Sequence, residues 1–414
     1  MYLVKINKRQ LIKHNYSDKS KFLEPGEYIF PNFYVGVFRE TLSKDPEALE
    51  ISPITVANEL KGDEDLNNKS LLILRAGGMG DVIFVTPFVK KLKEKYSNLS
   101  ITLATDYVFT KSFEPSFDKV ISFDNLTKNI FDSYDYKITL ENMVENNPEA
   151  ETMNIYDLHE SIFKVKLDDI VHPDLAVDPS TVYFLSKRLN KANFNIVLQL
   201  SASVIKRSIP SSVLKEFIVK YSYPNTVFWI GDSIKNIDMV DTFIKLCKRE
   251  KPSLRMVNFP KIGGSLLHLA SLIKESDLVI GADSNYVHIA AAFNVPSVGI
   301  YGPFPSDYRI GRYDKAIGID AISSCEYGRD IKKGDKIIAH SCFEHGDGRC
   351  QLATVTGSVF SPCLSLIKSE NILEAVDIAI KLYYGGNTTK YNTLVDTLPN
   401  KFGRFSGNGW QSNR

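Results

Sequence analysis

The sequence lacks long apolar runs and an excess of charge of either sign. Nowhere do about 18 apolar residues follow one another, which is the length that a membrane-crossing helix needs, and the first residues hold no apolar stretch typical of a signal peptide. The 50 Lys and Arg residues balance 49 Asp and Glu residues, so no basic field over the whole chain points to nucleic acid. We therefore expect a cytoplasmic protein with no membrane span.

Cysteine is scarce, with five residues and no Cys-x-x-Cys pair. In a reducing compartment such residues act as thiols or metal ligands rather than as a disulfide framework. Four of them fall in a glycine-rich segment: Cys325, Cys342, Cys350 and Cys363. They are either unconnected thiols or a tetrahedral site for a structural metal, in which His340 or His345 could replace one cysteine. Cys247, on a predicted helix, is expected to be a small buried hydrophobe.

The length of 414 residues exceeds what one core supports and indicates two or three domains. Short Tyr, Phe and Val segments, such as Glu27–Phe30 and Phe33–Phe38, lie between Pro-Gly and Pro-Asn turns and predict strands in a small β module. The polar run Lys61–Asn68 is typical of a linker. The predicted domains are a β-rich module over 1–68, an acceptor domain over 69–185, a nucleotide-sugar domain over 193–384 with a Cys-rich insertion at 322–363, and a flexible tail over 385–414.

Both halves open in the same way, as strand, polar turn and helix. Leu71–Leu74 leads into a glycine-rich turn and a helix predicted from Val82 to about Tyr96. Asn195–Leu200 leads into a polar turn and a helix over Ser211–Tyr221. This alternation predicts an α/β protein with two Rossmann-like domains that face one another across a cleft, where ligands bind beyond the carboxyl ends of the strands.

The segment 277–303 carries the most informative turn. An apolar strand, Leu278–Ile280, is followed by Asp283 and Ser284, and then by a helix with His288 one turn in. A second apolar strand, Ser297–Tyr301, follows and leads into Gly302. Backbone N–H groups at such a helix start favour an anion, so the turn is suited to a phosphate or diphosphate. Asp and Ser would equally serve to cap the helix.

Two further turns carry polar residues. In the first half, Gly78 and Gly80 precede Asp81, but the third position of a dinucleotide fingerprint is Ile83. An NAD site with Asp106 as its ribose-binding acid is therefore a weaker alternative. Asp81 would cap its helix or act as a general base, although the helix dipole lowers its basicity. In the second half the polar residues are Ser201, Lys206, Arg207 and, after the next strand, Asp232.

Lys206 and Arg207 suit a diphosphate leaving group, although Lys-Arg pairs are also common on solvated surfaces. The only Asp-x-Asp sequence, Asp63-Glu64-Asp65, lies in the predicted linker. No catalytic metal is therefore expected.

These motifs resemble the glycosyltransferase family that contains the ADP-heptose:lipopolysaccharide heptosyltransferases. The resemblance covers roughly residues 69–380. It rests on LLILRAGGMGDVIFVTPFVKKLKEKY in the first half and on an ordered series in the second half: Ser201, Lys206-Arg207, Pro210, Gly231, Asp283-Ser284, His288, Val295-Pro296 and Gly302-Pro303.

The resemblance implies a GT-B fold and an inverting, metal-independent transfer from an ADP- or UDP-linked sugar. It places the base on Asp81 and the phosphate lysine on Lys206. Where the family has Gly after Asp-Ser, this chain has Asn285, a residue that tolerates left-handed backbone angles. The residues expected to bind the nucleotide sugar are Gly78, Gly80, Ser201, Arg207, Asp232, Asp283, Ser284, Asn285, His288 and Gly302.

The acceptor stays open at this point. It could be a lipopolysaccharide core, a protein hydroxyl or a modified base in DNA, because the acceptor face lies in the variable first domain. The Cys cluster resembles a four-cysteine iron site of protein-modifying heptosyltransferases, with different spacing, which leaves iron and zinc open and favours a protein acceptor or a homo-oligomer. A non-catalytic nucleotide-sugar-binding protein and an NAD-dependent oxidoreductase are the competing classes.

Overall fold

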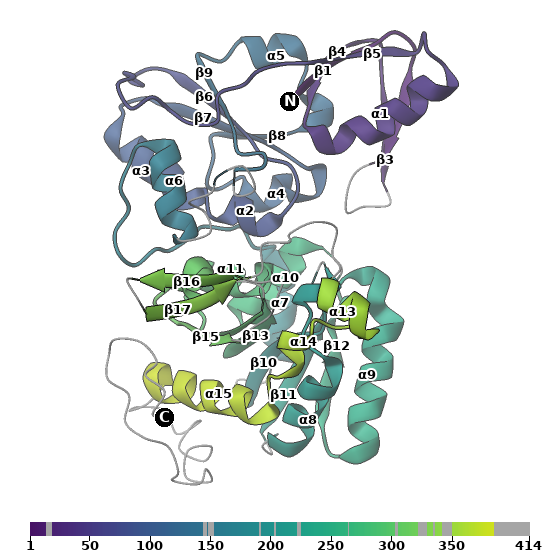
Figure 1. Ribbon diagram of the computed structural model, residues 1–414, viewed down its shortest axis with the longest axis vertical. Helices are drawn as coiled ribbons and strands as arrows, with labels where there is room; N and C mark the ends of the chain where they lie inside the picture. The colour runs from purple at the N-terminus through teal and green to yellow at the C-terminus, as the bar shows by residue number, and fades with distance from the viewer. Residues whose placement is uncertain are drawn as a thin grey trace.

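The computed structural model contains two parallel sheets and a small antiparallel sheet at the N-terminus (Figure 1). It describes residues 1–13, 19–143, 147, 153–189, 192–202, 204–221, 225–263, 265–302, 305–321, 329–333, 336–341 and 350–384. The predicted α/β fold with an N-terminal antiparallel sheet is thereby confirmed. No helix among these described residues combines the length and the apolar character needed to cross a membrane.

The N-terminal module, residues 1–53, contains a three-stranded antiparallel sheet of order β4-β1-β5, a hairpin and one helix. Its elements are β1 (Tyr2–Ile6), β2 (Gln10–Lys13), β3 (Ser20–Leu23), β4 (Gly26–Phe30), α1 (Asn32–Lys44) and β5 (Leu49–Pro53).

The strand predicted over Phe33–Phe38 is wrong, because this segment lies in α1. Tyr34 and Phe38, one helical turn apart, are buried, whereas Phe33 and Val37 are exposed. This spacing is that of one helix face rather than of alternating strand faces. Pro31 caps the helix N-terminally, where its extended backbone fits the position before the first helical turn.

The first parallel sheet has the order β8-β7-β6-β9. Leu71 and Ile73 of β6 belong to a core shared with helices α2, α3 and α6, while Leu72 and Leu74 pack against the N-terminal module. The module thus packs on one face of this sheet. Its elements are β6 (Ser70–Leu74), α2 (Met79–Ile83), α3 (Thr86–Lys95), β7 (Ser100–Thr105), α4 (Thr110–Phe113), β8 (Lys119–Ser122), α5 (Lys128–Asp132), β9 (Tyr136–Thr139) and α6 (Ile155–Phe163).

Residues 54–68 lie along the first sheet instead of forming a solvated linker. Ala57 forms an isolated bridge with Ile138 of β9, and the Leu60 N–H donates to a carbonyl of α6. Leu66, within the polar run, is 1% exposed. Glu64 accepts hydrogen bonds from the backbone N–H groups of two residues that precede it. The charged side chains of the polar run face solvent, whereas Leu66 within the run and Leu60 just before it belong to the core.

The second parallel sheet has six strands in the order β12-β11-β10-β13-β14-β15. Helices α8, α9 and α15 contribute to the core on one face and α7, α10 and α11 to the core on the other. Its elements are α7 (Pro179–Arg188), β10 (Phe194–Gln199), α8 (Ser211–Tyr221), β11 (Thr226–Gly231), α9 (Ile237–Glu250), β12 (Arg255–Asn258), α10 (Leu266–Lys274), β13 (Leu278–Ala282), α11 (Asn285–Ala292), β14 (Ser297–Tyr301), α12 (Asp307–Ile310), β15 (Ala316–Asp320), α13 (Gln351–Thr356), α14 (Pro362–Ser365) and α15 (Ser369–Tyr384). A hairpin of β16 (Arg329–Lys333) and β17 (Lys336–Ser341) stands apart from the sheet.

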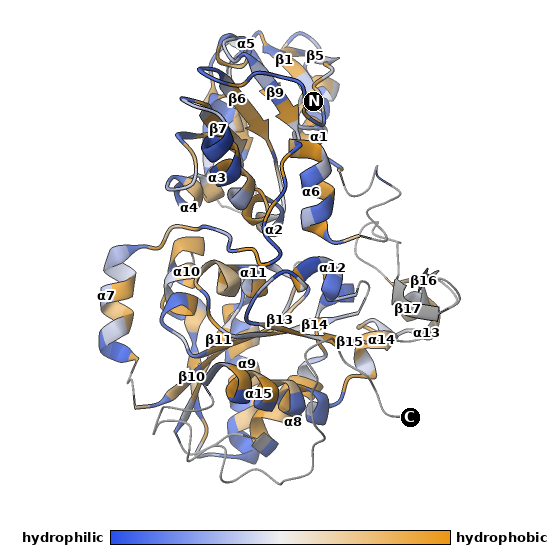
Figure 2. Ribbon diagram, turned by 90° about the vertical axis from the view of Figure 1, so that its left-hand side faces the viewer, coloured by the Kyte–Doolittle hydropathy of each residue, from blue (hydrophilic) through white to orange (hydrophobic). Residues whose placement is uncertain are grey.

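Helix α2 of the first half and helix α11 of the second half contact one another (Figure 1). Figure 2 shows the apolar strands at the centre of each half and α2 at the level where the halves meet. Each of these helices follows the carboxyl end of a central strand, β6 in one sheet and β13 in the other. The polar turns predicted from the sequence therefore lie at the junction of the halves.

Candidate active site

The first polar turn connects β6 to α2 through two glycines with left-handed backbone. Gly77 has φ of 71° and Gly78 has φ of 21°, a region that side chains with a Cβ adopt rarely. A Cβ at Gly78 would lie 2.1 Å from Oδ2 of Asp81. The missing side chain is thus what allows the Asp81 carboxylate to fold back over the turn.

Asp81 does not cap α2. It is the third residue of the helix, whose N-cap is Gly78, and its Oδ2 accepts a hydrogen bond of 2.6 Å from Nη2 of Arg75. Burial raises the pKa of the Asp81 carboxyl, but the charge and hydrogen bond of Arg75 outweigh burial, so the pKa lies below its ordinary value. The carboxylate is therefore ionised at neutral pH.

Arg75 and Glu141 are site residues that the sequence reasoning missed. Nη1 of Arg75 donates to the carbonyl of Leu140 at 2.8 Å, and Oε1 of Glu141 accepts from the backbone N–H of Ala76 at 2.5 Å. Burial raises the pKa of Glu141 more than the charge of Arg75 lowers it. The only sequence signal was the position of Arg75 directly before the glycines, since its partners after β9 are remote in the chain.

Asp106 occupies the place that an NAD site would assign to its ribose-binding acid. Its side chain is fully buried, and its two carboxylate oxygens accept hydrogen bonds from Tyr34 Oη at 2.5 Å and from the Gly77 N–H at 2.7 Å. A buried carboxylate held in this way does not face a ribose. The geometry thus disfavours the NAD hypothesis.

Three turns of the second half converge at the carboxyl ends of β10, β11 and β13. Nη1 of Arg207 lies 3.8 Å from Oδ2 of buried Asp283, and the Ser201 hydroxyl donates to Asp232 at 2.8 Å. Gln199 joins the turns, because its side chain donates to Ser284 Oγ at 2.8 Å and accepts from the Ala282 N–H. Burial raises the pKa of Asp232. The sequence reasoning did not single out Gln199, because the partners through which it joins the turns, Ser284 and Ala282, lie more than 80 positions away.

At the start of α11, no backbone N–H group donates a capping hydrogen bond to the side chain of the N-cap residue. Ser284 is the N-cap but its hydroxyl makes no capping bond; it donates instead to Oδ1 of Asn285 at 3.0 Å. Asn285 is the first helical residue and is absent from the described residues with left-handed backbone. The turn therefore accommodates Asn in place of Gly without a left-handed backbone at this position. An uncapped helix start of this kind suits an anion.

Lys206 lies in a single 3-10 turn, Ile205–Arg207, and is 5% exposed. Its carbonyl accepts a hydrogen bond of 2.8 Å from Ser361, just before α14. The same helix covers Gly302, where an added Cβ would lie 2.8 Å from Leu364 and 3.2 Å from Cys363 Sγ. The end of the Cys-rich segment thus supports two of the predicted donor turns.

Helix α11 meets α2 across the junction. Nδ2 of Asn285 lies 3.5 Å from the sulfur of Met79, and a Cβ at Gly80 would lie 3.1 Å from the His288 ring. Nδ1 of His288 pairs with Tyr313 Oη at 3.0 Å. Burial lowers the pKa of His288 to about 4, so the ring is neutral at physiological pH. His288 is a packing residue of the junction, buried between the helices.

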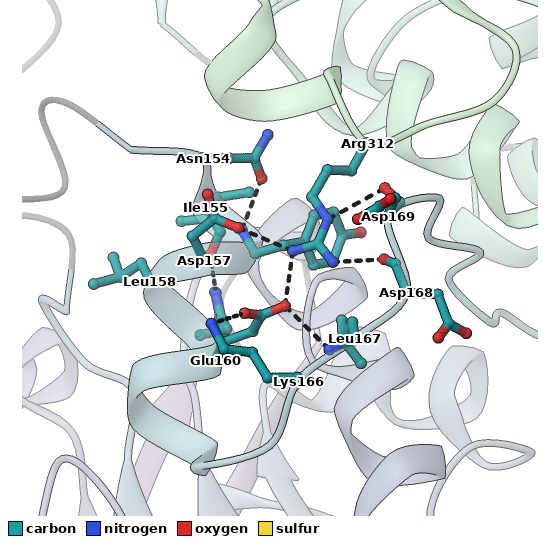
Figure 3. Close-up of polar contacts among 12 residues, drawn as sticks. Asn154, Ile155, Asp157, Leu158, Glu160, Lys166, Leu167, Asp168, Asp169 and Arg312 are labelled. Atoms are coloured by element: carbon teal, nitrogen blue, oxygen red, sulfur yellow. Dashed lines mark hydrogen bonds and ion pairs between the residues drawn. The ribbon is translucent and has the colours of Figure 1, made fainter.

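A second contact between the halves surrounds Arg312 (Figure 3). Its guanidinium donates to Glu160 at 2.9 Å and to Asp157 at 3.0 Å, both on α6. It also donates to the carbonyls of Asp168 and Asp169. The Arg312 carbonyl in turn accepts from the Val171 N–H. This clasp fixes α6 and the segment that follows it against the second half.

The predicted cysteine site falls largely outside the described residues, where Cys325 and Cys342 lie. Cys350 precedes α13 and Cys363 lies in α14, and neither takes part in a disulfide within the described part of the chain. The described residues contain no group of three or more His, Cys, Asp and Glu arranged to hold a metal. Cys247 is buried, as predicted, and burial raises its pKa to about 11.

Two facing parallel sheets with polar turns at their carboxyl edges define an α/β fold of the GT-B-like kind. Residues 239–331 match the sequence profile of glycosyltransferase family 9 (heptosyltransferase). Within these residues the chain is therefore similar to glycosyltransferase family 9, the family that the motifs resemble.

One curated protein and several solved structures are similar to this chain. Lipopolysaccharide heptosyltransferase 1 of Campylobacter coli is 29% identical over 137 residues, which are 32% of this chain and 39% of that protein. The family 9 glycosyltransferase structure from Veillonella parvula has a TM-score of 0.54 at 15% identity, covering 77% of this chain and 99% of its own. E. coli ADP-heptose heptosyltransferase II has a TM-score of 0.53 at 14% identity, covering 75% and 98%.

The fold likeness also extends to the dodecameric, iron-containing heptosyltransferase TibC of enterotoxigenic E. coli. Its complex with ADP-D-β-D-heptose has a TM-score of 0.51 at 11% identity and covers 92% of this chain and 91% of TibC. At these identities the likeness to solved structures concerns the fold.

Proposed function

We propose that this protein is an inverting glycosyltransferase that moves a sugar of the heptose type from a nucleotide diphosphate to an acceptor hydroxyl. The observation that carries the proposal is the apposition of α2 and α11. It brings the turn with the Asp81 carboxylate against the uncapped helix start that follows Asp283 and Ser284. A base on one side and an anion site on the other are what a single displacement at an anomeric carbon requires.

In the proposed step, Asp81 accepts the proton of the acceptor hydroxyl as the oxygen attacks the anomeric carbon. The bond from that carbon to the diphosphate oxygen breaks on the opposite face, so the configuration inverts. The departing diphosphate carries the electron pair toward Lys206, Arg207 and the N–H groups at the start of α11. The proton stays on the Asp81 carboxyl until solvent removes it.

The pairing of Asp81 with Arg75 has a cost for this step, because a carboxylate with a lowered pKa is a weaker base. It also keeps Asp81 ionised and aimed along the turn. Displacement of water by the acceptor raises the basicity of the carboxylate at the moment of reaction.

We propose ADP-heptose as the donor, with UDP-sugars as the alternative. Three comparisons support an ADP-linked heptose: the family match and the names of two structural neighbours. The acceptor is a lipopolysaccharide core, a protein hydroxyl or a modified DNA base; the net charge of +1 gives the DNA alternative no support. A cytoplasmic location, a homo-oligomer and the division at 1–68, 69–185, 193–384 and 385–414 stay predictions.

We also propose a structural iron or zinc ion on Cys325, Cys342, Cys350 and Cys363. Thiolates suit either metal, and the iron-containing neighbour TibC supports the idea. Because α14 carries Cys363 and contacts Gly302, such an ion would stabilise the donor turns without taking part in the transfer. Elemental analysis of the purified protein tests this: close to one equivalent of Fe or Zn is expected, and less than a tenth contradicts it.

The experiment for the proposed function compares Asp81→Asn with the wild type. We expect the release of ADP from ADP-heptose, with and without a candidate acceptor, to fall by at least about a thousandfold. Donor binding, followed by calorimetry, should be unchanged. The matched control is Asp132→Asn on the exposed side of α5, which should act like the wild type. Substantial turnover by Asp81→Asn would remove Asp81 as the base, and a wild type that binds the donor without turning it over would favour the non-catalytic binding protein.

A further inference from the structure

The N-terminal module touches the candidate catalytic turn through one buried pair of side chains. Tyr34 on α1 is 4% exposed and Asp106, after β7, is fully buried. The hydroxyl of Tyr34 donates to one oxygen of Asp106 at 2.5 Å, and the other oxygen accepts the N–H of Gly77 at 2.7 Å. A chain of two hydrogen bonds thus joins a helix of the module to the turn that precedes Asp81.

The two residues before Gly77 make their N–H hydrogen bonds to other partners. Arg75 N–H donates to the carbonyl of Ala104 on β7, and Ala76 N–H donates to Glu141. Gly77, with its left-handed backbone, makes its N–H bond to Asp106 instead. The carboxylate of Asp106 therefore sets the conformation of the residue from which the chain turns back toward Asp81.

The hydroxyl of Tyr34 matters separately from the packing of its ring. The ring lies in an aromatic group with Phe30, at 5.3 Å between centroids, and Phe123, at 6.2 Å. These contacts hold α1 on the sheet and would survive loss of the hydroxyl. The buried carboxylate of Asp106 would then lose a donor, and a buried charge that loses a hydrogen bond reorganises its remaining partners.

We infer that Tyr34 is a positioning residue, through which the N-terminal module fixes the Gly77–Gly78 turn and thereby the Asp81 carboxylate. The inference rests on the proposed function for the role of Asp81. It gives the module a part in the reaction itself, since α1 supplies a polar contact that the first parallel sheet does not supply. Loss of the contact should loosen the turn while leaving the donor turns of the second half unchanged.

Hydrogen exchange measured by mass spectrometry tests the structural half of this inference without reference to activity. In Tyr34→Phe, amides of a peptide that spans residues 75–84 should exchange about tenfold faster than in the wild type. A peptide that spans 280–290, in the second half, should be unchanged. The control is Tyr28→Phe in the same module, whose hydroxyl bonds only to the exposed Glu24 carbonyl among its described contacts.

The functional half uses release of ADP from ADP-heptose. For Tyr34→Phe we expect kcat to fall about tenfold with KM for the donor unchanged. The acid limb of the kcat profile should move to higher pH, because a looser turn weakens the contact with Arg75 that lowers the pKa of Asp81. Asp106→Asn, as a second variant, should reproduce both effects.

Two outcomes would overturn the inference: unchanged exchange over 75–84 in both variants, or faster exchange with kcat and the acid limb unchanged. These outcomes differ from a failure of the proposed function. If Asp81→Asn is fully active, the role of Asp81 is wrong whatever Tyr34 does. If Asp81→Asn is inactive and Tyr34→Phe resembles the wild type, only the inference fails.

Discussion

At the residue scale, the ion pair between Arg75 and Asp81 decides the pH dependence of the proposed reaction. The exposed fractions of the two side chains are 14% and 35%, so solvent screens the pair only in part. The pair lowers the pKa of Asp81, and the carboxylate is ionised down to a lower pH than a free Asp. Arg75→Gln removes the charge and keeps a donor.

We predict that Arg75→Gln shifts the acid limb of kcat/KM to higher pH, because the pKa of Asp81 rises when the charge of Arg75 no longer opposes the effect of burial. The binding of the donor should be unaffected, because the proposed diphosphate site lies in the turns of the second half. The measurement is ADP release between pH 4 and pH 8. An acid limb at the same pH in the two proteins would show that Arg75 does not control the titration of Asp81.

Two buried histidines predict a second pH effect, on stability. Burial lowers the pKa of both His159 and His288 to about 4. Below pH 6.5 the unfolded chain binds protons that the folded rings do not, so the unfolding free energy should fall as pH decreases from 6.5 to 4. The slope is on the order of 1 kcal/mol per pH unit for each ring. Urea denaturation at several pH values measures it.

His159→Phe provides the control for this effect. The His159 ring stacks on Phe88 and Phe163, and its Nε2 has no hydrogen-bond partner among the described residues. A phenyl ring fits such surroundings and does not titrate. We expect the variant to lose about half of the slope; a slope equal to that of the wild type would contradict the assignment.

Some site residues could be predicted from the sequence and others could not. The difference is how far along the chain their contact partners lie. Asp81, Ser284 and Lys206 can be recognised because each lies in the polar segment that connects an apolar strand to the next helix, or in the first turn of that helix. Arg75, Gln199 and Asp106 are not recognised in this way, because each also bonds to an atom 29 to 83 positions away: the Leu140 carbonyl, the Ala282 N–H and the Gly77 N–H, respectively. Local pattern carries no information about such contacts.

At the element scale, two glycines give opposite predictions. Gly36 lies on the exposed side of α1, where an added Cβ meets nothing within 4 Å. Gly231 ends β11, where a Cβ would lie 2.4 Å from the hydroxyl and 2.8 Å from the ring of buried Tyr286. Gly36→Ala should therefore raise the unfolding free energy by about 0.5–1 kcal/mol.

Gly231→Ala should lower the unfolding free energy by about 1–3 kcal/mol, because the rigid ring of Tyr286 must move. Urea denaturation of the two variants beside the wild type measures both signs. A neutral result for Gly231→Ala would mean that Tyr286 has room to shift, and a destabilising Gly36→Ala would contradict the helical assignment of α1.

Elements with a strict pattern were predicted closely, and those with mixed signals were not. The helix over Ser211–Tyr221 and the strand over Ser297–Tyr301 have the predicted bounds. The helix predicted from Val82 to Tyr96 is two helices, α2 and α3, with Pro87 in the first turn of the second. Proline fits a helix start and not its interior, so it marks the break.

At the scale of the whole molecule, Arg312 is the clearest link between the halves. Its side chain is 13% exposed and that of its partner Glu160 is 6% exposed. Removal of the Arg312 charge therefore leaves the buried Glu160 carboxylate with less positive charge near it. Arg312→Met should lower the unfolding free energy by about 3 kcal/mol. Urea denaturation tests this, together with small-angle scattering, which should show a larger radius of gyration.

The control for the Arg312 clasp is an exposed pair. Lys8→Met breaks the contact with Asp45, whose side chain, like that of Lys8, is more than 40% exposed. This variant should lower the unfolding free energy far less than Arg312→Met does. Equal costs for the two variants would show that the clasp is no stronger than a surface pair.

The sequence predicted the two parallel sheets because each half repeats strand, turn and helix. It did not predict that the N-terminal module covers one face of the first sheet. That arrangement depends on Leu72 and Leu74 meeting Phe30 and Phe38, contacts between segments that no periodicity connects. The mutual position of α2 and α11 likewise follows from packing between the halves.

The most direct test of the central claim is a binding panel on the purified full chain, with ADP-heptose, other ADP- and UDP-sugars and NAD, read by thermal shift and confirmed by calorimetry. We predict that an ADP- or UDP-linked sugar binds and raises Tm, that Asp81→Asn retains this binding, and that Lys206→Ala loses at least about tenfold in affinity. Binding of NAD in preference to every nucleotide sugar, or binding that Lys206→Ala leaves unchanged, would contradict the account.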